Sequence, residues 1–155
     1  MVIMEKTIQE LRKIIVDFNT RLKAISDSDL SAKPLPNKWS RKEVIGHLID
    51  SAQNNLRRFI CGQYESVPPK ITYQQEFWVN ANQYQNQSSE DVITLWRLIN
   101  TQIVSVLASM PKDKYAALCE TNELRTLEWL ADDYVRHLKH HLNQVIPGSF
   151  DIKYS

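Results

Sequence analysis

The sequence predicts an all-α protein: one four-helix bundle with a long crossover between its second and third helices. Three observations support this prediction. Apolar residues recur every three or four positions over four long segments of the 155-residue chain. The six prolines all fall between these segments, where helices usually end. The sequence has no repeats, low-complexity tracts or β-rich runs. From the length of 155 residues we expect a single domain over residues 1–155.

The first two helices have clear apolar stripes. The first is expected over residues 4–25, where apolar side chains share one face. The second opens at "SRKE", in which Ser40 and Glu43 can form a capping box. It is expected to continue to about Cys61, with Gly62 as a left-handed stop.

A long connection and two further helices complete the bundle. Residues 63–87 are too long for a simple turn, and their second half can form a short helix. The third helix is expected over residues 88–110 and the fourth over residues 126–146. Pro147 and Gly148 follow the fourth helix and close it. The bundle is therefore expected to contain one crossover link.

The composition restricts the classes of function. Nineteen basic and eighteen acidic residues give a net charge of +1, which offers no electrostatic basis for binding nucleic acid. The two cysteines have no metal-type spacing, and we expect reduced thiols in a cytoplasmic protein. The N-terminus becomes charged by residue 5, unlike a signal peptide, and no unbroken apolar run suits a membrane span.

Three of the four histidines fall in the stretch "RHLKHHLNQV" of the fourth helix. His137 and His141 lie four residues apart, so their rings share one helix face and can hold one metal ion. Spacing indicates that both belong to the inward-facing stripe, where unpaired imidazoles are costly. This stripe consists of Leu127, Leu130, Tyr134, His137, His141 and Val145. Core histidines with hydrogen-bond partners are the alternative explanation.

A third ligand would have to be His47, which lies on the second helix. On a helical wheel, this residue lies roughly 160° from the centre of the apolar arc. It shares a polar face with Glu43, Ser51, Asn54 and Arg58. That face is either solvated or lines a cleft opposite the fourth helix, and periodicity does not decide between the two.

The combination of these motifs resembles the DinB/YfiT-like superfamily. The resemblance lies in a tryptophan before the capping box, "GHLIDS" on the second helix and "HLKHHLNQV" on the last. In that family, a histidine of the second helix and an H-x-x-x-H pair on the last helix hold a divalent metal. The matching positions are His47, His137 and His141, and the resemblance favours the cleft interpretation of the polar face. Family members also commonly form homodimers.

The resemblance implies a metal-dependent enzyme acting on a small molecule. Three imidazoles leave a coordination position open, as in catalytic sites. Zinc or nickel suits this ligand set best, with iron or manganese as further options. The expected activity is hydrolysis, and the alternatives are a metal-dependent thiol S-transferase or a non-catalytic, stress-related dimeric bundle that binds metal.

Five further residues are candidates for supporting roles. Asp50 and Asp133 lie one turn from the expected ligands, where either can orient a histidine or act as a general base. Arg58 can bind an anionic group of the substrate. Trp78 and Tyr84, in the long connection, can cover the cleft as substrate-binding residues, although aromatic residues there more often serve packing.

Overall fold

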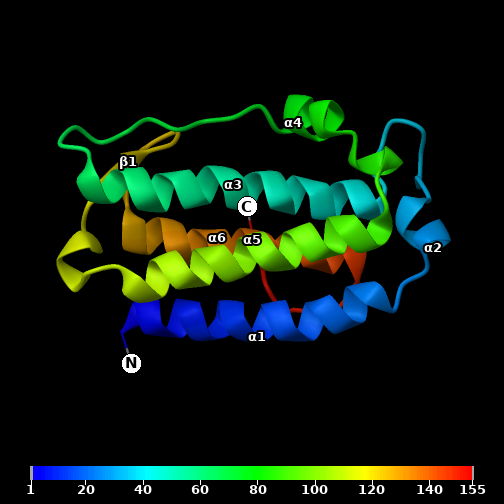
Figure 1. The fold of residues 1–155 in the computed structure, drawn as a ribbon, viewed down its shortest axis with the longest axis horizontal. Coiled ribbons are helices and arrows are strands. Elements are labelled where there is room, and N and C mark those ends of the chain that lie inside the picture. Colours follow the sequence, from blue (N-terminus) through cyan, green and yellow to red (C-terminus); the bar gives the residue numbers. More distant parts are fainter. Residues whose placement is uncertain (1, 155) are drawn as a thin grey trace.

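Four long helices form a bundle in the computed structural model, which describes residues 2–154 (Figure 1). Both α1 and α3 pack against α5 and α6, so α1 lies diagonally opposite α3. This arrangement confirms the predicted all-α bundle with four main helices. Their bounds are α1 (Ile3–Lys23), α3 (Arg41–Tyr64), α5 (Ser89–Ser109) and α6 (Leu127–Val145).

The crossover between α3 and α5 is a consequence of their direction. The two helices are neighbours that run the same way along the bundle, so the chain must return along its full length between them (Figure 1). The returning segment contains α4 (Gln75–Asn82) and the 3₁₀ helix η1 (Tyr84–Asn86). It runs alongside α3, which places a second layer over that helix.

Several short elements, none of them predicted from the sequence, join the long helices. The chain passes from α1 to α3 through α2, and from α5 to α6 through the 3₁₀ helix η2 and an antiparallel hairpin. Each hairpin strand has three residues, too few for alternation to signal a strand. The bounds are α2 (Asp27–Ser31), η2 (Lys112–Lys114), β1 (Leu118–Glu120) and β2 (Leu124–Thr126).

The boundaries of α3 agree with the prediction at one end only. The capping box is present: the Ser40 hydroxyl accepts from the Glu43 N–H, and the Ser40 N–H donates to the Glu43 carboxylate, both at 3.1 Å. The expected stop at Gly62 is wrong, because the helix continues to Tyr64. Gly62 instead leaves room for Leu127, whose Cδ2 would lie 2.7 Å from an added Cβ.

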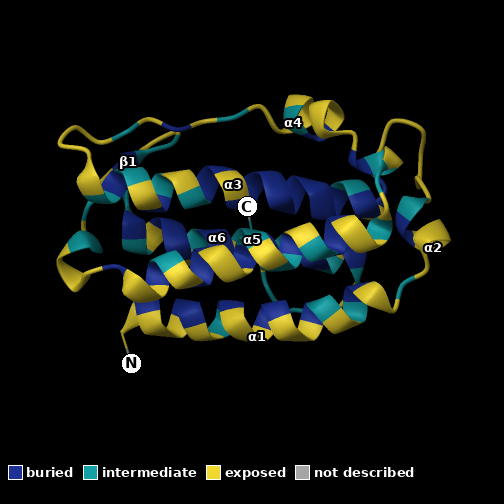
Figure 2. Ribbon diagram, viewed as in Figure 1, coloured by how far each residue is buried: buried dark blue, intermediate teal, exposed yellow. Residues whose placement is uncertain are grey.

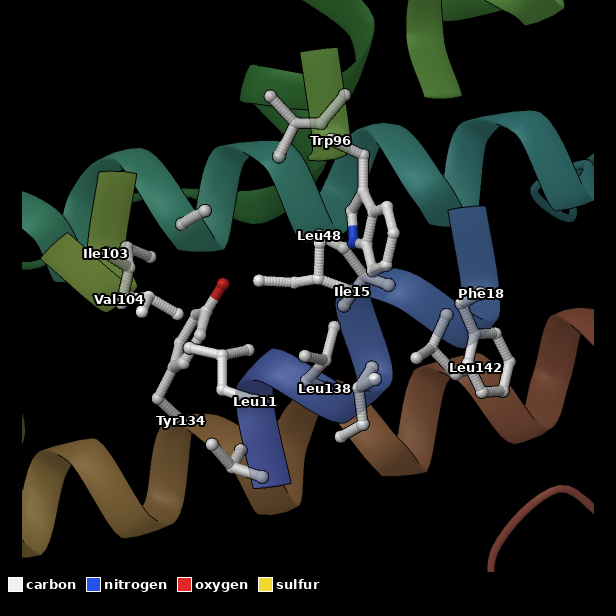
Figure 3. Close-up of a cluster of buried hydrophobic side chains, with 14 of the residues drawn as sticks. Leu11, Ile15, Phe18, Leu48, Trp96, Ile103, Val104, Tyr134, Leu138 and Leu142 are labelled. Atoms are coloured by element: carbon white, nitrogen blue, oxygen red, sulfur yellow. The ribbon is translucent and has the colours of Figure 1, made fainter. Parts of the chain in front are cut away.

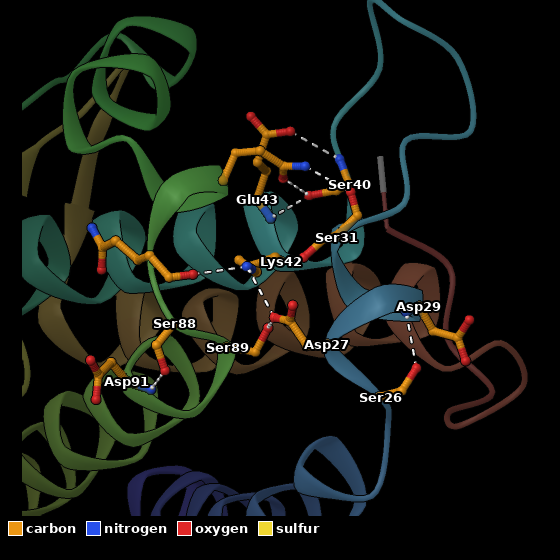
Figure 4. Close-up of polar contacts among 12 residues, drawn as sticks. Ser26, Asp27, Asp29, Ser31, Ser40, Lys42, Glu43, Ser88, Ser89 and Asp91 are labelled. Atoms are coloured by element: carbon orange, nitrogen blue, oxygen red, sulfur yellow. Dashed lines mark hydrogen bonds and ion pairs between the residues drawn. The ribbon is translucent and has the colours of Figure 1, made fainter.

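A hydrogen-bonded network fixes the end of the bundle where α3 begins (Figure 4). The Lys42 side chain is only 4% exposed, donates to the Gln87 carbonyl at 2.8 Å and pairs with Asp27 at 3.3 Å. Ser89 also bonds Asp27. Because these residues come from α2, α3 and the approach to α5, the network sets the position of α3 in the bundle.

The core lies between the four long helices (Figure 3). Most of its side chains are apolar, and the buried pair of Asn100 and Tyr134 is an exception. The Tyr134 hydroxyl donates to the Asn100 Oδ1 at 2.5 Å. The side chains labelled in the figure are Leu11, Ile15, Phe18, Leu48, Trp96, Ile103, Val104, Tyr134, Leu138 and Leu142.

Among the helices described, α5 alone is long and apolar enough to cross a membrane. Its residues Val92, Trp96 and Ile103 are fully buried in the bundle. The core helix of a soluble bundle has these same properties, so α5 is weak support for a membrane span. Both cysteines, Cys61 and Cys119, are free thiols.

Candidate metal centre

The polar face of α3 is buried rather than solvated. His47 is 0% exposed, Ser51 1% and Asn54 7%. Buried residues occupy all sides of the first half of α3 (Figure 2), because the crossover covers the side that the bundle leaves open. The solvated-face interpretation of this helix is therefore wrong, and His47 lies between α3 and α6.

Tyr84 attaches the crossover to α3 through ring packing and a hydrogen bond. Its ring covers Gly46, where an added Cβ would lie 2.1 Å from the Tyr84 Cδ2. Its hydroxyl donates to the Asp50 Oδ1 at 2.6 Å, and the Asn82 amide donates to the same oxygen at 3.0 Å. Asp50 therefore holds the crossover rather than orienting His47, to which it has no hydrogen bond among the described residues.

The Asp50 carboxyl group is deeply buried. Its Oδ2 has no hydrogen-bond partner among residues 2–154. Burial raises the pKa of Asp50 to about 6, against the opposing effect of the hydrogen bonds from Tyr84 and Asn82. The carboxyl group is thus partly protonated near neutral pH.

Three histidines converge between α3 and α6. The Nε2 atoms of His47 and His137 lie 3.3 Å apart. His141 completes the group: each of the three residues offers one ring nitrogen, and these nitrogens all lie within 4.8 Å of one another. The structure therefore brings together the three predicted ligands from two helices.

The histidines of α6 do not occupy the core-facing stripe, so this part of the prediction is wrong. His137 and His141 are half-buried, and the leucines that follow each of them, Leu138 and Leu142, are fully buried instead. A leucine loses no hydrogen bonds on burial, whereas an imidazole does. The histidines consequently lie at the side of the stripe and face α3.

The three imidazoles are neutral at neutral pH. Burial lowers the pKa of His47 to about 4 and that of His137 to about 2, with a further contribution from the neighbouring histidines. Burial also lowers the pKa of His141, although its bond to Gln144 opposes the shift. Neutral imidazoles each keep one nitrogen lone pair, which is the form that binds metal.

A hydrogen bond assigns the nitrogens of one ligand, His141. The Nδ1 of His141 lies 2.8 Å from the Gln144 Oε1, an acceptor, so this nitrogen carries the proton and the Nε2 is free. The Nδ1 of His137 lies 3.5 Å from the Ser51 hydroxyl. The His47 Nδ1 is buried without a partner among residues 2–154. Converging lone pairs repel unless a cation lies between them, so these residues fit a divalent metal.

Aromatic rings pack around the cluster. The Trp39 ring lies 5.1 Å from that of His47, centre to centre. The Tyr154 ring lies 5.7 Å from that of His137 and 5.6 Å from that of His140. The sequence motif included Trp39, but nothing in the sequence predicted that Tyr154 reaches the cluster.

The C-terminal tail brings Tyr154 to the site. Phe150 stacks on Phe18 of α1, with ring centres 5.4 Å apart, and exchanges two backbone hydrogen bonds with the Asn143 side chain. The chain then returns along α6, where the Tyr154 hydroxyl donates to the Asp133 Oδ2 at 3.2 Å. Burial raises the pKa of Asp133 despite this bond.

A cavity of about 400 Å³ reaches the cluster at His137. Its lining includes Arg58 and Asp133, two of the residues that the sequence nominated. Trp78 and Tyr84 lie outside the lining: the first packs against Tyr73, and the second is buried on α3. Other lining residues, which were not among the candidates from the sequence, include Ser51, Asn55, Tyr73, Arg125 and Tyr154.

A second cavity, of about 740 Å³, is lined by two residues that contact the cluster but by none of the three histidines. Trp39, which packs on His47, and Gln144, which bonds His141, belong to its lining. The rest of the lining has two acidic residues, Asp29 and Glu76, and three basic ones. The basic residues are Lys33, Lys38 and Arg41.

Fold and site together define a class of protein: a four-helix bundle with a three-histidine metal-binding cluster built from its second and last long helices. The chain belongs to the DinB superfamily, whose sequence profile matches residues 10–145. This match confirms the resemblance described above.

Two known proteins are similar to this chain in sequence or in fold. YfiT of Bacillus subtilis (strain 168), named as a candidate metal-dependent hydrolase, is 22% identical over 144 residues, which cover 91% of this chain and 81% of YfiT. The solved structure of YfiT, described as an unusual four-helix bundle, matches with a TM-score of 0.81 over 92% of this chain and 83% of that one. A mycothiol-dependent maleylpyruvate isomerase matches with a TM-score of 0.69 and 11% identity, over 90% of this chain and 59% of the isomerase.

Proposed function

We propose that this protein is a metal-dependent hydrolase whose divalent ion is held by His47, His137 and His141. The convergence of three neutral imidazoles beside a polar cavity is the observation that carries the proposal. Three protein ligands leave a coordination position for a reacting molecule, which distinguishes catalytic from structural sites. The likeness to YfiT, a candidate metal-dependent hydrolase by name, supports the same reaction class.

The side chains of the cavity have separate tasks in this proposal. A divalent ion bound here would supply Lewis-acid chemistry, lowering the pKa of water from 15.7 to about 7 or polarising a carbonyl group. Gln144 fixes the proton of His141 on Nδ1 and so directs the Nε2 of that ring to the centre. Asp133, with a raised pKa and its Oδ2 bonded by Tyr154, is the carboxyl group that can take up and return a proton.

Reconstitution with single metals tests the proposal. Metal-free protein is loaded separately with zinc, nickel, manganese or iron and assayed against activated carboxylic esters, amides and phosphodiesters. We expect turnover with at least one ion and a loss of at least about 100-fold in kcat/KM in His137→Ala. His140→Ala, which alters a neighbouring histidine outside the cluster, serves as the control. Equal turnover by metal-free and reloaded protein would contradict the proposal.

A thiol S-transferase is the second candidate, and the likeness to a mycothiol-dependent isomerase favours it. In this reaction the open position would receive the sulfur of a low-molecular-weight thiol. The same reloaded samples are assayed with glutathione, cysteine or mycothiol and an alkylating electrophile. Metal-dependent consumption of thiol without any ester, amide or phosphodiester hydrolysis would replace the first candidate with the second.

A further inference from the structure

Arg58 is rigidly held at the edge of the cavity. Its Nε and Nη2 atoms donate to the Ile71 carbonyl at 3.1 and 2.8 Å, and its Nη1 donates to the Asn55 Oδ1 at 3.3 Å. The guanidinium therefore joins α3 to the crossover in one defined orientation. It has five N–H donors, three of which make these contacts, so two are left for another acceptor.

The half-buried guanidinium has no carboxylate of the described residues in direct contact, although the charge of Asp133 in the same cavity acts on it from beyond ion-pair distance. No carboxylate among residues 2–154 forms an ion pair with it within 4.0 Å. The other arginine of the cavity, Arg125, pairs with Glu123 at 2.6 Å. Asp133 accepts from Tyr154 instead of from Arg58. An unpaired buried cation is costly unless an anion arrives to neutralise it.

Arg58 and the metal cluster share this cavity. His137 and Arg58 both belong to its lining, and the positive charge of Arg58 contributes to the lowered pKa of His137. The cavity volume of about 400 Å³ is suited to a small molecule. Tyr73, whose ring centre lies 5.9 Å from the guanidinium carbon, adds an apolar surface beside the charge.

We propose that Arg58 binds a carboxylate group of the substrate while the reacting group of the same molecule lies at the histidine cluster. The substrate class is therefore small carboxylic acids that carry a second, reactive group. The planar fork of an arginine matches the two oxygens of a carboxylate, which favours this anion. This inference rests on the proposed function for the reacting end, but the Arg58 contact itself needs no metal.

The first test observes Arg58 directly in the metal-free wild-type protein. The NMR signal of its Nε–H group is followed during titration with succinate and, separately, with the uncharged analogue succinamide. We expect a saturable shift with succinate and none with succinamide. An unmoved Arg58 signal at saturating succinate, or equal shifts with both compounds, would overturn the proposal.

The second test compares two adjacent arginines by substitution. Arg58→Gln is expected to weaken succinate binding at least about tenfold, as measured from the backbone amides of the cavity. Arg57→Gln removes the same charge from an exposed position of α3 outside the cavity and should leave the affinity within about twofold. Equal losses in the two variants would contradict the assignment.

The two tests remain interpretable if Arg58→Gln does not fold, or if the protein is not a metal-dependent hydrolase. Should Arg58→Gln fail to fold because the bond to Ile71 is lost, the wild-type titration alone decides. Failure of the proposed function is separately visible: a protein without metal-dependent turnover would still show the succinate shift at Arg58 if the anion site is correct.

Discussion

The Nε2 atoms of His47 and His137 lie 3.3 Å apart, although the two residues are separated by 90 positions in the sequence. One belongs to α3 and the other to α6, two helices that pack directly against each other. The metal centre therefore depends on tertiary packing, in addition to the spacing of the two histidines within α6.

Replacing His141 with alanine is expected to abolish metal retention. Two imidazoles remain in the variant, and two ligands hold a divalent ion much more weakly than three. We expect the zinc content after dialysis to fall from about one equivalent to less than about one tenth. His140→Ala, adjacent in sequence but outside the cluster, should retain zinc. Elemental analysis of both purified variants checks the prediction, and unchanged zinc in His141→Ala would contradict it.

Asp50→Asn is expected to change how stability depends on pH. The pKa of Asp50 rises from 3.8 to about 6 on folding, mainly through burial. Between these two pKa values the folded protein binds a proton at Asp50 that the unfolded chain does not bind. Proton binding therefore stabilises the folded state, fully below pH 4, and this stabilisation is lost as the pH rises through 6. Relative to the variant, the wild-type free energy of unfolding should fall on the order of 2 kcal/mol between pH 4 and 7.

Urea unfolding of the metal-free proteins at several pH values measures this difference. The asparagine keeps the Oδ1 acceptor for Tyr84 and Asn82, so the variant isolates the effect of the charge. Parallel stability curves for the two proteins would show that Asp50 does not titrate in this range.

Gly46→Ala is expected to destabilise the protein through a clash with Tyr84. The new Cβ would lie 2.1 Å from the Cδ2 of a buried ring whose hydroxyl is held by Asp50. Gly62→Ala is the comparison variant, because its Cβ would lie 2.7 Å from the Leu127 Cδ2, a smaller overlap than the one with the Tyr84 ring. We expect Gly46→Ala to cost about 2 kcal/mol more in unfolding free energy than Gly62→Ala. Equal unfolding midpoints of the two variants would contradict close packing of Tyr84 on Gly46.

Tyr134→Phe is expected to leave a buried acceptor without a partner. The hydroxyl donates to the Asn100 Oδ1 in the core, and both residues are at most 3% exposed. Loss of the hydroxyl should cost about 1–3 kcal/mol of stability, measured by chemical unfolding. Adding Asn100→Leu should recover part of this loss, because the unsatisfied oxygen is then removed. A double variant less stable than Tyr134→Phe would argue against this explanation.

Periodicity was sufficient to predict the long helices, because each buries one apolar stripe. It could not decide the environment of His47, since the chain that covers the polar face of α3 comes from a distant crossover. On α6 two stripes had almost the same spacing, one through His137 and one through Leu138. The leucine stripe is the one that is buried, because leucine side chains, unlike imidazoles, lose no hydrogen bonds in the core.

The candidate site was predictable in part for the same reasons. His47, His137 and His141 were identified by their helical spacing together with the family motif, and the structure brings them together. Arg58 shared the helix face of His47 and was nominated on that basis. Tyr154 reaches the site from a C-terminal tail that has no periodic pattern, and the sequence gives no signal for a contact of this kind.

The order of the ligands along the chain affects when an ion can be held during synthesis. During translation, α3 leaves the ribosome carrying His47 before His137 and His141 have been synthesised. The other two are made about 90 residues later, which takes roughly 5–20 seconds at ordinary elongation rates. A nascent chain therefore lacks the three-histidine site for most of its synthesis, and the site forms only when the last long helix docks.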